Sequence, residues 1–99
     1  MKDLMNTVEM MASNDYKERF KAEYAQTKIR YEKLKAFNTK IEAAHATEQC
    51  LPAGVESKAK VIEMPKHDCP DYLLREQQRV MGEYLHILEV RAVIEGVEL

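Results

Sequence analysis

The sequence predicts an all-α fold, an antiparallel two-helix hairpin with a short N-terminal helix, which assembles into an oligomeric helical bundle. Two stretches with helical spacing of apolar residues make up most of the 99 residues, one from Tyr16 to about Ala46 and one from Pro70 to about Glu95. The second stretch carries apolar side chains over a wider arc than one partner helix can cover. We therefore expect further copies of the chain to cover the rest of that arc.

Composition narrows the classes of function. Hydrophobic residues make up 45% and charged residues 32% of the chain, as in a small globular domain with a large surface. The net charge of -2 and the absence of a Lys/Arg-rich block argue against binding to DNA, RNA or an anionic membrane. No apolar run approaches the roughly 20 residues that span a bilayer, and the N-terminus lacks a signal-peptide pattern. We expect a cytoplasmic protein whose two cysteines are free thiols.

The first segment, residues 1–14, is expected to form an N-terminal arm or short helix. Leu4, Val8 and Met11 lie on one face of such a helix. We expect this face to pack on a neighbouring subunit.

The hairpin domain spans residues 15–99, and its first arm is expected over about 15–46. Asp15 and Glu18 have the spacing of a capping box, which marks the start of the helix. Steps of four and three residues then define a seam that packs at a shallow angle against a partner helix. The seam residues are Phe20, Tyr24, Thr27, Tyr31, Leu34, Asn38 and Ile41.

A stripe of lysines, Lys21, Lys28 and Lys35, follows one flank of this seam at seven-residue spacing. Such a stripe is usually a solvated surface. If the protein binds a ligand that carries phosphate, Lys28 and Lys35 are the residues that we expect to attract it.

The tip of the hairpin, residues 47–69, is long compared with the usual helix connection of about 2 to 8 residues. His45, Cys50, His67 and Cys69 are of the types that bind zinc, but no Cys-x-x-Cys pair occurs, so we expect no metal. Cys69 with His67 lacks an oxyanion-binding element and an enclosed pocket. We therefore expect neither enzymatic activity nor a cofactor.

The second arm is expected over about 70–95, because Pro70 suits the first helical turn and Gly96 suits the end of a helix. Residues 15–42 carry eight basic and five acidic side chains, a net charge of +3, whereas residues 70–99 carry three basic and six acidic ones, a net charge of -3. This bias favours antiparallel pairing of the arms. The two aliphatic rows of the second arm are Leu74, Met81 and Leu88, and Leu73, Val80, Ile87 and Ile94.

A polar row interrupts this arm, where Gln77, Tyr84 and Arg91 follow one another at seven-residue spacing. In one interpretation they form a buried polar network that fixes the helix register, with Arg91 paired to Glu23 or to a backbone carbonyl.

In the other interpretation the same row lines a ligand pocket. Arg91 would hold a phosphate, Tyr84 would stack on a base or bind a ribose, and Gln77 would recognise a polar edge. Arg30 and Tyr31 would complete such a pocket if the arms run antiparallel. These residue types suit a nucleotide.

The order of residues in both arms resembles the small helical-hairpin proteins of bacteriophages in the crAss-phage-related family. The runs that carry the resemblance are YKERFKAEYAQTKIRYEKLKAF and LLREQQRVMGEYLHILEVRAVIEG. The matching residues are Glu23, Tyr24, Gln26, Arg30, Lys33, Leu34, Leu73, Leu74, Gln77, Met81, Tyr84, Leu88 and Arg91.

That family is similar in architecture to the hairpin domain of phage sponge proteins, which block CBASS or Thoeris immunity by sequestering cyclic oligonucleotides or cyclic ADP-ribose derivatives between subunits. The resemblance implies a phage-encoded binder that traps a nucleotide immune signal without catalysis, in the cytoplasm of an infected bacterium. The expected ligand-binding residues are Arg91, Tyr84, Gln77, Arg30, Tyr31, Lys28 and Lys35. The alternative is a helical adaptor or inhibitor whose wide aliphatic face binds a host or phage protein.

Overall fold

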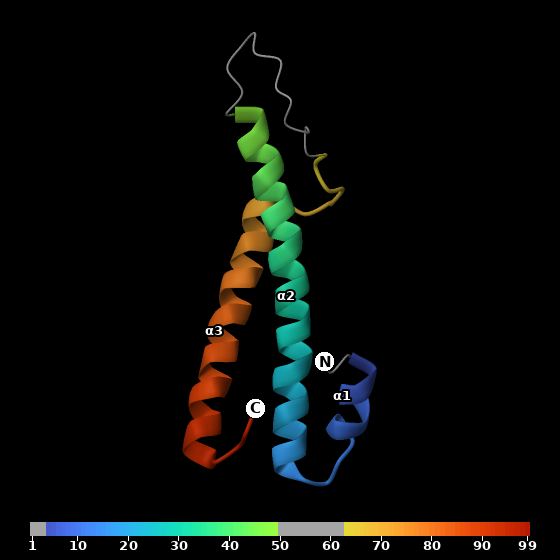
Figure 1. Ribbon diagram of the computed structural model, residues 1–99, viewed down its shortest axis with the longest axis vertical. Helices are drawn as coiled ribbons and strands as arrows, with labels where there is room; N and C mark the ends of the chain where they lie inside the picture. The colour runs from blue at the N-terminus through green and yellow to red at the C-terminus, as the bar shows by residue number, and fades with distance from the viewer. Residues whose placement is uncertain (1–3, 50–62) are drawn as a thin grey trace.

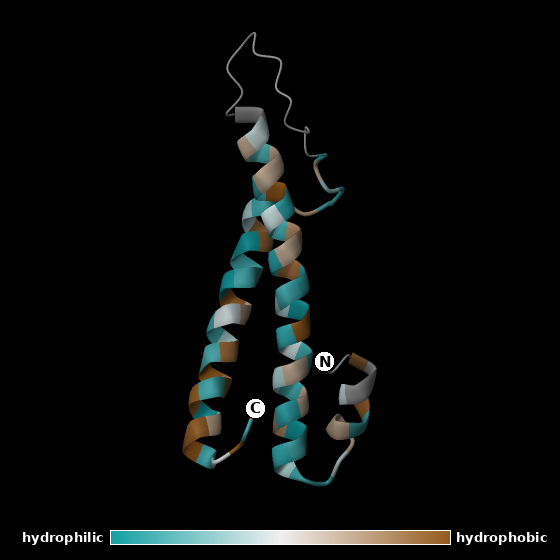
Figure 2. Ribbon diagram, viewed as in Figure 1, coloured by the Kyte–Doolittle hydropathy of each residue, from teal (hydrophilic) through white to brown (hydrophobic). Residues whose placement is uncertain are grey.

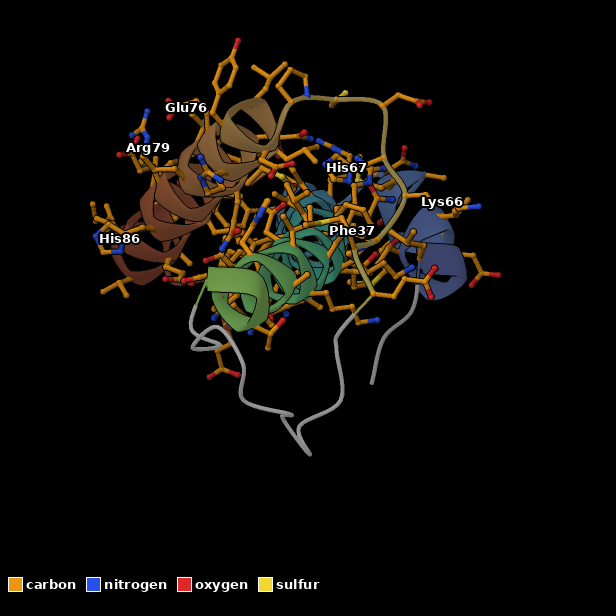
Figure 3. The ribbon with its side chains drawn as sticks, turned by 90° about the horizontal axis from the view of Figure 1, so that it is seen from above. Phe37, Lys66, His67, Glu76, Arg79 and His86 are labelled. Atoms are coloured by element: carbon orange, nitrogen blue, oxygen red, sulfur yellow. The ribbon has the colours of Figure 1, made fainter. Side chains whose placement is uncertain are left out.

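In the computed structural model, which describes residues 4–49 and 63–99, three helices follow one another along the chain. They are α1 (Leu4–Met11), α2 (Tyr16–Gln49) and α3 (Asp71–Glu95). The long helices α2 and α3 form the hairpin, and α1 lies on the other side of α2 from α3 (Figures 1 and 3). No strand occurs in these residues, so the expected all-α hairpin with a short N-terminal helix is confirmed.

The molecule is long and narrow, with extents of 63 × 25 × 24 Å. Residues 50–62, which belong to the expected tip segment 47–69 and include Cys50, lie outside the described part of the chain. Within the described ranges, no helix combines the length and the apolar character needed to cross a membrane.

Helix α1 packs against α2 of its own chain, whereas we expected this segment to pack on a neighbour. The face that it buries also differs from the expected one. Thr7 is fully buried, while Val8 and Met11 are exposed. The burial of Thr7 is possible because its hydroxyl donates to the Leu4 carbonyl at 2.7 Å, so the buried hydroxyl has a hydrogen-bond partner.

At the start of α2, side chains accept hydrogen bonds from backbone N–H groups that have no partner within the helix. Asp15 Oδ1 accepts from the N–H of Lys17 at 3.0 Å, which confirms Asp15 as a cap. The N–H of Asp15 itself donates to Ser13 Oγ at 3.1 Å, the place that Glu18 would take in a capping box. The helix continues to Gln49, a few residues beyond the expected end.

Helix α3 begins at Asp71, directly after Pro70, and ends at Glu95. Gly96 adopts the left-handed conformation, with φ 69° and ψ 35°, as expected for a residue that ends a helix. The N–H of Val97 then donates to the Ala92 carbonyl at 2.8 Å. This turn directs the C-terminal residues back across the hairpin toward α2 (Figure 1).

The core lies in the seam between α2 and α3, as the four-three spacing predicted. Near the open end of the hairpin, Phe20 packs with Leu88, Ala92 and Val97, and Tyr24 lies against this cluster. The register follows from side-chain contacts between the arms, which join Tyr16 to Glu95, Tyr24 to Glu89, Asn38 to Gln78 and His45 to Asp71.

Within residues 4–49 and 63–99, nothing covers the outer face of α3. Leu73, Val80, Ile87 and Ile94 form the second aliphatic row, and they expose between 49% and 78% of their surface. Val93 beside them is 84% exposed. Figure 2 shows the resulting apolar bands along α3. The assembly that we expected to cover this face stays a prediction.

Candidate ligand-binding groove

The polar row of α3 lies at the edge of the seam, and its three members are exposed to solvent. Arg91 donates from Nε to Glu95 at 3.1 Å and from Nη2 to the Tyr16 hydroxyl at 2.7 Å. Its guanidinium also lies 5.0 Å above the centre of the Phe20 ring. The hydrogen bond to Glu95 is the main cause that raises the pKa of Arg91. Arg91 therefore has partners inside its own chain, and they do not include Glu23.

Glu23 instead accepts a hydrogen bond from the Tyr84 hydroxyl. This bond, with partial burial, raises the pKa of Tyr84, because ionising the phenol would place a second negative charge beside the carboxylate. Tyr84 is thus held as a neutral donor. Gln77 is exposed near the other end of α3.

The arms run antiparallel as expected, but their register does not bring the candidate residues into one pocket. Tyr16, which contacts Arg91, precedes Arg30 by 14 residues along α2, or about 21 Å. Tyr31 packs against Gly82, where an added Cβ would lie 3.2 Å from the Tyr31 ring. Lys35 is exposed farther along α2. Within one copy, the phosphate that Arg91 was expected to hold is therefore out of reach of Arg30.

A groove of about 580 Å³ runs along the part of α2 that carries Lys28, the only one of the seven candidate ligand residues that lines it in the described structure. Its lining is mainly apolar, and three lysines lie along it. The C-terminal residues Glu98 and Leu99 reach the groove from the end of α3. The remaining lining residues are Lys21, Tyr24, Ala25, Ile29, Glu32, Lys33 and Ala36.

The electrostatics of the groove are set by Lys28 and its neighbours. Lys28 Nζ lies 5.7 Å from the centre of the Tyr24 ring, close enough for a cation–π contact. The Tyr24 hydroxyl donates to Glu89 on α3 at 2.6 Å. Burial, followed by this hydrogen bond, raises the pKa of Tyr24 to about 12. Tyr24 therefore stays neutral, and its ring is fixed beside the lysine.

A second cavity, of about 290 Å³, lies toward the tip of the hairpin beside a cluster of titratable groups. Asp71 accepts from His45 Nε2 at 2.8 Å and also from His67 Nε2. His67 Nδ1 donates to the Pro65 carbonyl at 2.8 Å, and its ring meets Phe37 edge to face (Figure 3). The residues that line this cavity are Asn38, Ile41, Glu42, His45, Asp71 and Arg75.

The two histidines of this cluster, which are of a type that binds zinc, are both partners of the Asp71 carboxylate. Cys69 is a free, exposed thiol. In the part of the chain that the structure describes, no group of three or more suitable side chains is arranged to hold a metal ion.

The sequence did not indicate that these residues line one groove. Lys21 and Lys28 were recognised as a stripe, and Tyr24 as a seam residue, but Lys33 and the contribution of Glu98 and Leu99 were not. The lysine stripe was the available signal, because it predicts a basic flank on α2. The fold-back after Gly96 depends on packing between residues that are far apart in the sequence.

A comparison with models of known protein families finds one that matches this chain. The family model named Sequestin matches two segments, residues 14–52 and 55–94. A search of curated proteins found no match, and neither did a search of solved structures. The relation to the crAss-phage-related family stays a prediction. Because the two matched segments together span well over half of the 99 residues, the chain belongs to the Sequestin family.

Proposed function

We propose that this protein is a phage anti-defence sponge, which binds and sequesters a nucleotide immune signal of the cyclic oligonucleotide or cyclic ADP-ribose type without catalysis. The name of the Sequestin family suggests, in coarse terms, that its members sequester a molecule. The ligand class, the phage origin and the absence of catalysis are our proposals.

The observation that carries the proposal is the groove on α2. Its volume of about 580 Å³ falls within the range of small-molecule sites, roughly 300 to 1,000 Å³. An apolar floor suits the faces of bases, and Lys21, Lys28 and Lys33 suit the phosphates. The ring of Tyr24 beside Lys28 adds an aromatic surface.

The other expected ligand residues could contact the ligand if copies of the chain associate. Arg91, Tyr84, Gln77, Arg30 and Tyr31 are spread along the hairpin, so they can act on one ligand only where copies of the chain meet. The exposed aliphatic face of α3 supports such an assembly, since an uncovered apolar row of this length normally marks an interface. Lys35, exposed on α2, would attract the phosphates from a distance.

A thermal-shift experiment tests the proposal. The purified protein is heated alone and with a panel of cyclic dinucleotides, cyclic trinucleotides and cyclic ADP-ribose isomers. A ligand at 100 times its Kd should stabilise the folded state by about 2.7 kcal/mol, which raises the melting temperature. A melting temperature unchanged across the whole panel would contradict a sponge for this class of ligand.

A matched pair of lysine variants then locates the site. Lys28→Ala should weaken binding of the positive ligand by about tenfold or more, because a charge-assisted contact in the groove is lost. Lys40→Ala removes the same charge from an α2 position outside the groove and should leave the affinity unchanged. Equal effects of both variants would mean that only the net charge of α2 matters.

Arg91→Ala tests the polar row of α3. For a sponge in which Arg91 holds phosphate, this variant should lose ligand binding while the oligomer keeps its size in light scattering. Loss of assembly instead would assign Arg91 a structural role, in line with its contacts to Glu95, Tyr16 and Phe20.

The alternative function is a helical adaptor or inhibitor that binds a host or phage protein. The same exposed row of Leu73, Val80, Ile87 and Ile94 favours it, because an amphipathic helix can bind in a groove of a partner. If no nucleotide raises the melting temperature and the chain is monomeric in solution, the adaptor is the better account of this face.

A further inference from the structure

The C-terminal residues occupy a position that packing fixes. Gly96 turns the chain, and Val97, which follows it, is buried against Phe20 and Leu88 in the core. The hydrogen bond from the Val97 N–H to the Ala92 carbonyl holds the turn in place. Residues 98 and 99 therefore begin from an anchored point.

From this point the chain reaches the groove on α2, where Glu98 and Leu99 form part of the lining. Leu99 extends the apolar part of the groove and is about half exposed. Glu98 is exposed and brings a carboxylate to the same groove as Lys21 and Lys28. A residue from the far end of the sequence thus takes part in a surface formed mainly by one helix.

The charged groups of the groove nearly balance. Counting side chains only, its lining contains three lysines and two glutamates, Glu32 and Glu98, which sum to +1. Without Glu98 the side chains would sum to +2. The attraction of a groove for an anionic ligand grows with the charge of the ligand, and so does the repulsion by a carboxylate within it.

We propose that Glu98 is a specificity-determining residue that limits the charge of the ligand, so that the groove favours nucleotides with one or two negatively charged phosphate groups over polyphosphates. This inference rests on the proposed function of the groove. Cyclic nucleotides carry one negative charge per phosphodiester, whereas cellular nucleoside triphosphates carry several in a short chain. A trap that must act in the presence of abundant triphosphates gains selectivity from such a carboxylate.

Isothermal titration with three adenine nucleotides of increasing charge tests this inference. The probes are cyclic AMP, cyclic di-AMP and ATP, each titrated into the unmodified protein and into Glu98→Gln. The gain in affinity caused by Glu98→Gln should increase with ligand charge, from less than about twofold for cyclic AMP to roughly threefold or more for ATP. Because Glu98 is exposed, the melting temperature of the free variant should stay unchanged.

Glu42→Gln is the matched control. It removes the same charge from α2 at a position nine residues from Lys33, the lysine of the groove nearest to it in the sequence, about 14 Å along the helix and outside the groove. This distance exceeds the Debye length of about 8 Å at physiological salt, so the control should change no affinity.

The outcomes separate this inference from the proposed function. Equal gains for all three probes, no gain, or the same gains in Glu42→Gln would overturn the role of Glu98 while leaving the groove as a nucleotide site. If neither the unmodified protein nor Glu98→Gln binds any of the probes, the inference about Glu98 is overturned; if the panel of cyclic dinucleotides, cyclic trinucleotides and cyclic ADP-ribose isomers also leaves the melting temperature unchanged, the proposed function is overturned with it.

Discussion

At the scale of single residues, the Asp71 carboxylate connects α3 both to α2 and to the segment that precedes α3. Asp71 begins α3 and accepts from His45 on α2 and from His67 in the segment before α3. Both ring nitrogens of His67 face acceptors, Asp71 and the Pro65 carbonyl, and only the protonated ring donates to both. The pKa of His67 is accordingly raised, first by the Pro65 carbonyl and then by Asp71. The two histidines lower the pKa of Asp71.

The stability of the hairpin should therefore depend on pH through this cluster. A raised pKa of His67 means that its contribution is complete below the ordinary value of 6.5 and is lost as the pH rises through the raised pKa. A lowered pKa of Asp71 means that its contribution is complete above 3.8 and is lost as the pH falls through the lowered pKa. His67→Gln should lower the melting temperature most near about pH 5 and least near about pH 8.

The control for this prediction is His86→Gln. His86 lies on the outer side of α3, well away from the tip, and its side chain is 76% exposed (Figure 3). This variant should change the melting temperature little at either pH. A loss in His67→Gln that is the same at both pH values would show that packing against Phe37, and not protonation, is what His67 contributes.

At the scale of helices, the seam between α2 and α3 depends on a few well-covered side chains. Leu88 is fully buried among Phe20, Ala92 and Val97. Asn38 takes a seam position as well, and its Nδ2 donates to the Leu74 carbonyl at 3.1 Å and to Gln78 at 2.9 Å. Its Oδ1 is buried without a hydrogen-bond partner in the described structure. The apolar contacts stabilise the pairing of the helices, and the Asn38 amide favours one register.

Leu88→Ala should lower the free energy of unfolding by about 2 to 5 kcal/mol, because it leaves a cavity in the only part of the seam where several side chains of the described chain form one cluster. Urea denaturation followed by circular dichroism measures the change. Val8→Ala on α1, where Val8 is 61% exposed, is the control and should change it by less than about 0.5 kcal/mol. Comparable losses in both variants would contradict this assignment of the core.

The helices and their seam could be predicted from the sequence, whereas the composition of the candidate site could not. The steps from Phe20 to Ile41 repeat over several turns, so the pattern determines one face of α2. The eight residues of α1 repeat the apolar spacing over too few turns to determine a face, and the structure buries Thr7, whose hydroxyl donates to the Leu4 carbonyl, in place of Val8 and Met11. The register between the arms follows from contacts between residues that are far apart in the sequence, such as Tyr24 and Glu89. The positions of Arg91 and Arg30 relative to each other could therefore not be predicted from the sequence.

At the scale of the whole molecule, the hairpin has one covered side and one open side. Helix α1 and the C-terminal residues pack on α2, but nothing in the described chain covers the outer row of α3. On α3, Arg79 forms ion pairs with Glu76 and Glu83. Figure 3 shows Arg79 and Glu76 on the outside of this helix. The exposed apolar row is therefore the surface best suited to a second copy.

Self-association should be visible in light scattering coupled to size-exclusion chromatography, as a mass that is a multiple of 11.5 kDa. Ile87→Glu, in the middle of the exposed row, should shift the protein toward a single subunit without loss of helix content, because a charge would be buried in the contact. Val8→Glu on α1 should leave the mass unchanged. A single-subunit mass for the unmodified protein would contradict the proposed assembly.

The missing side chain at Gly82 has a mechanical consequence for the hairpin. The Tyr31 ring lies 3.2 Å from the place where a Cβ on residue 82 would stand, so an alanine there would force this ring to move by a few tenths of an ångström. The atoms that would have to move belong to the side chain of Tyr31 and not to the backbone of either helix. The empty space at Gly82 therefore determines where the Tyr31 ring can rest between the two arms.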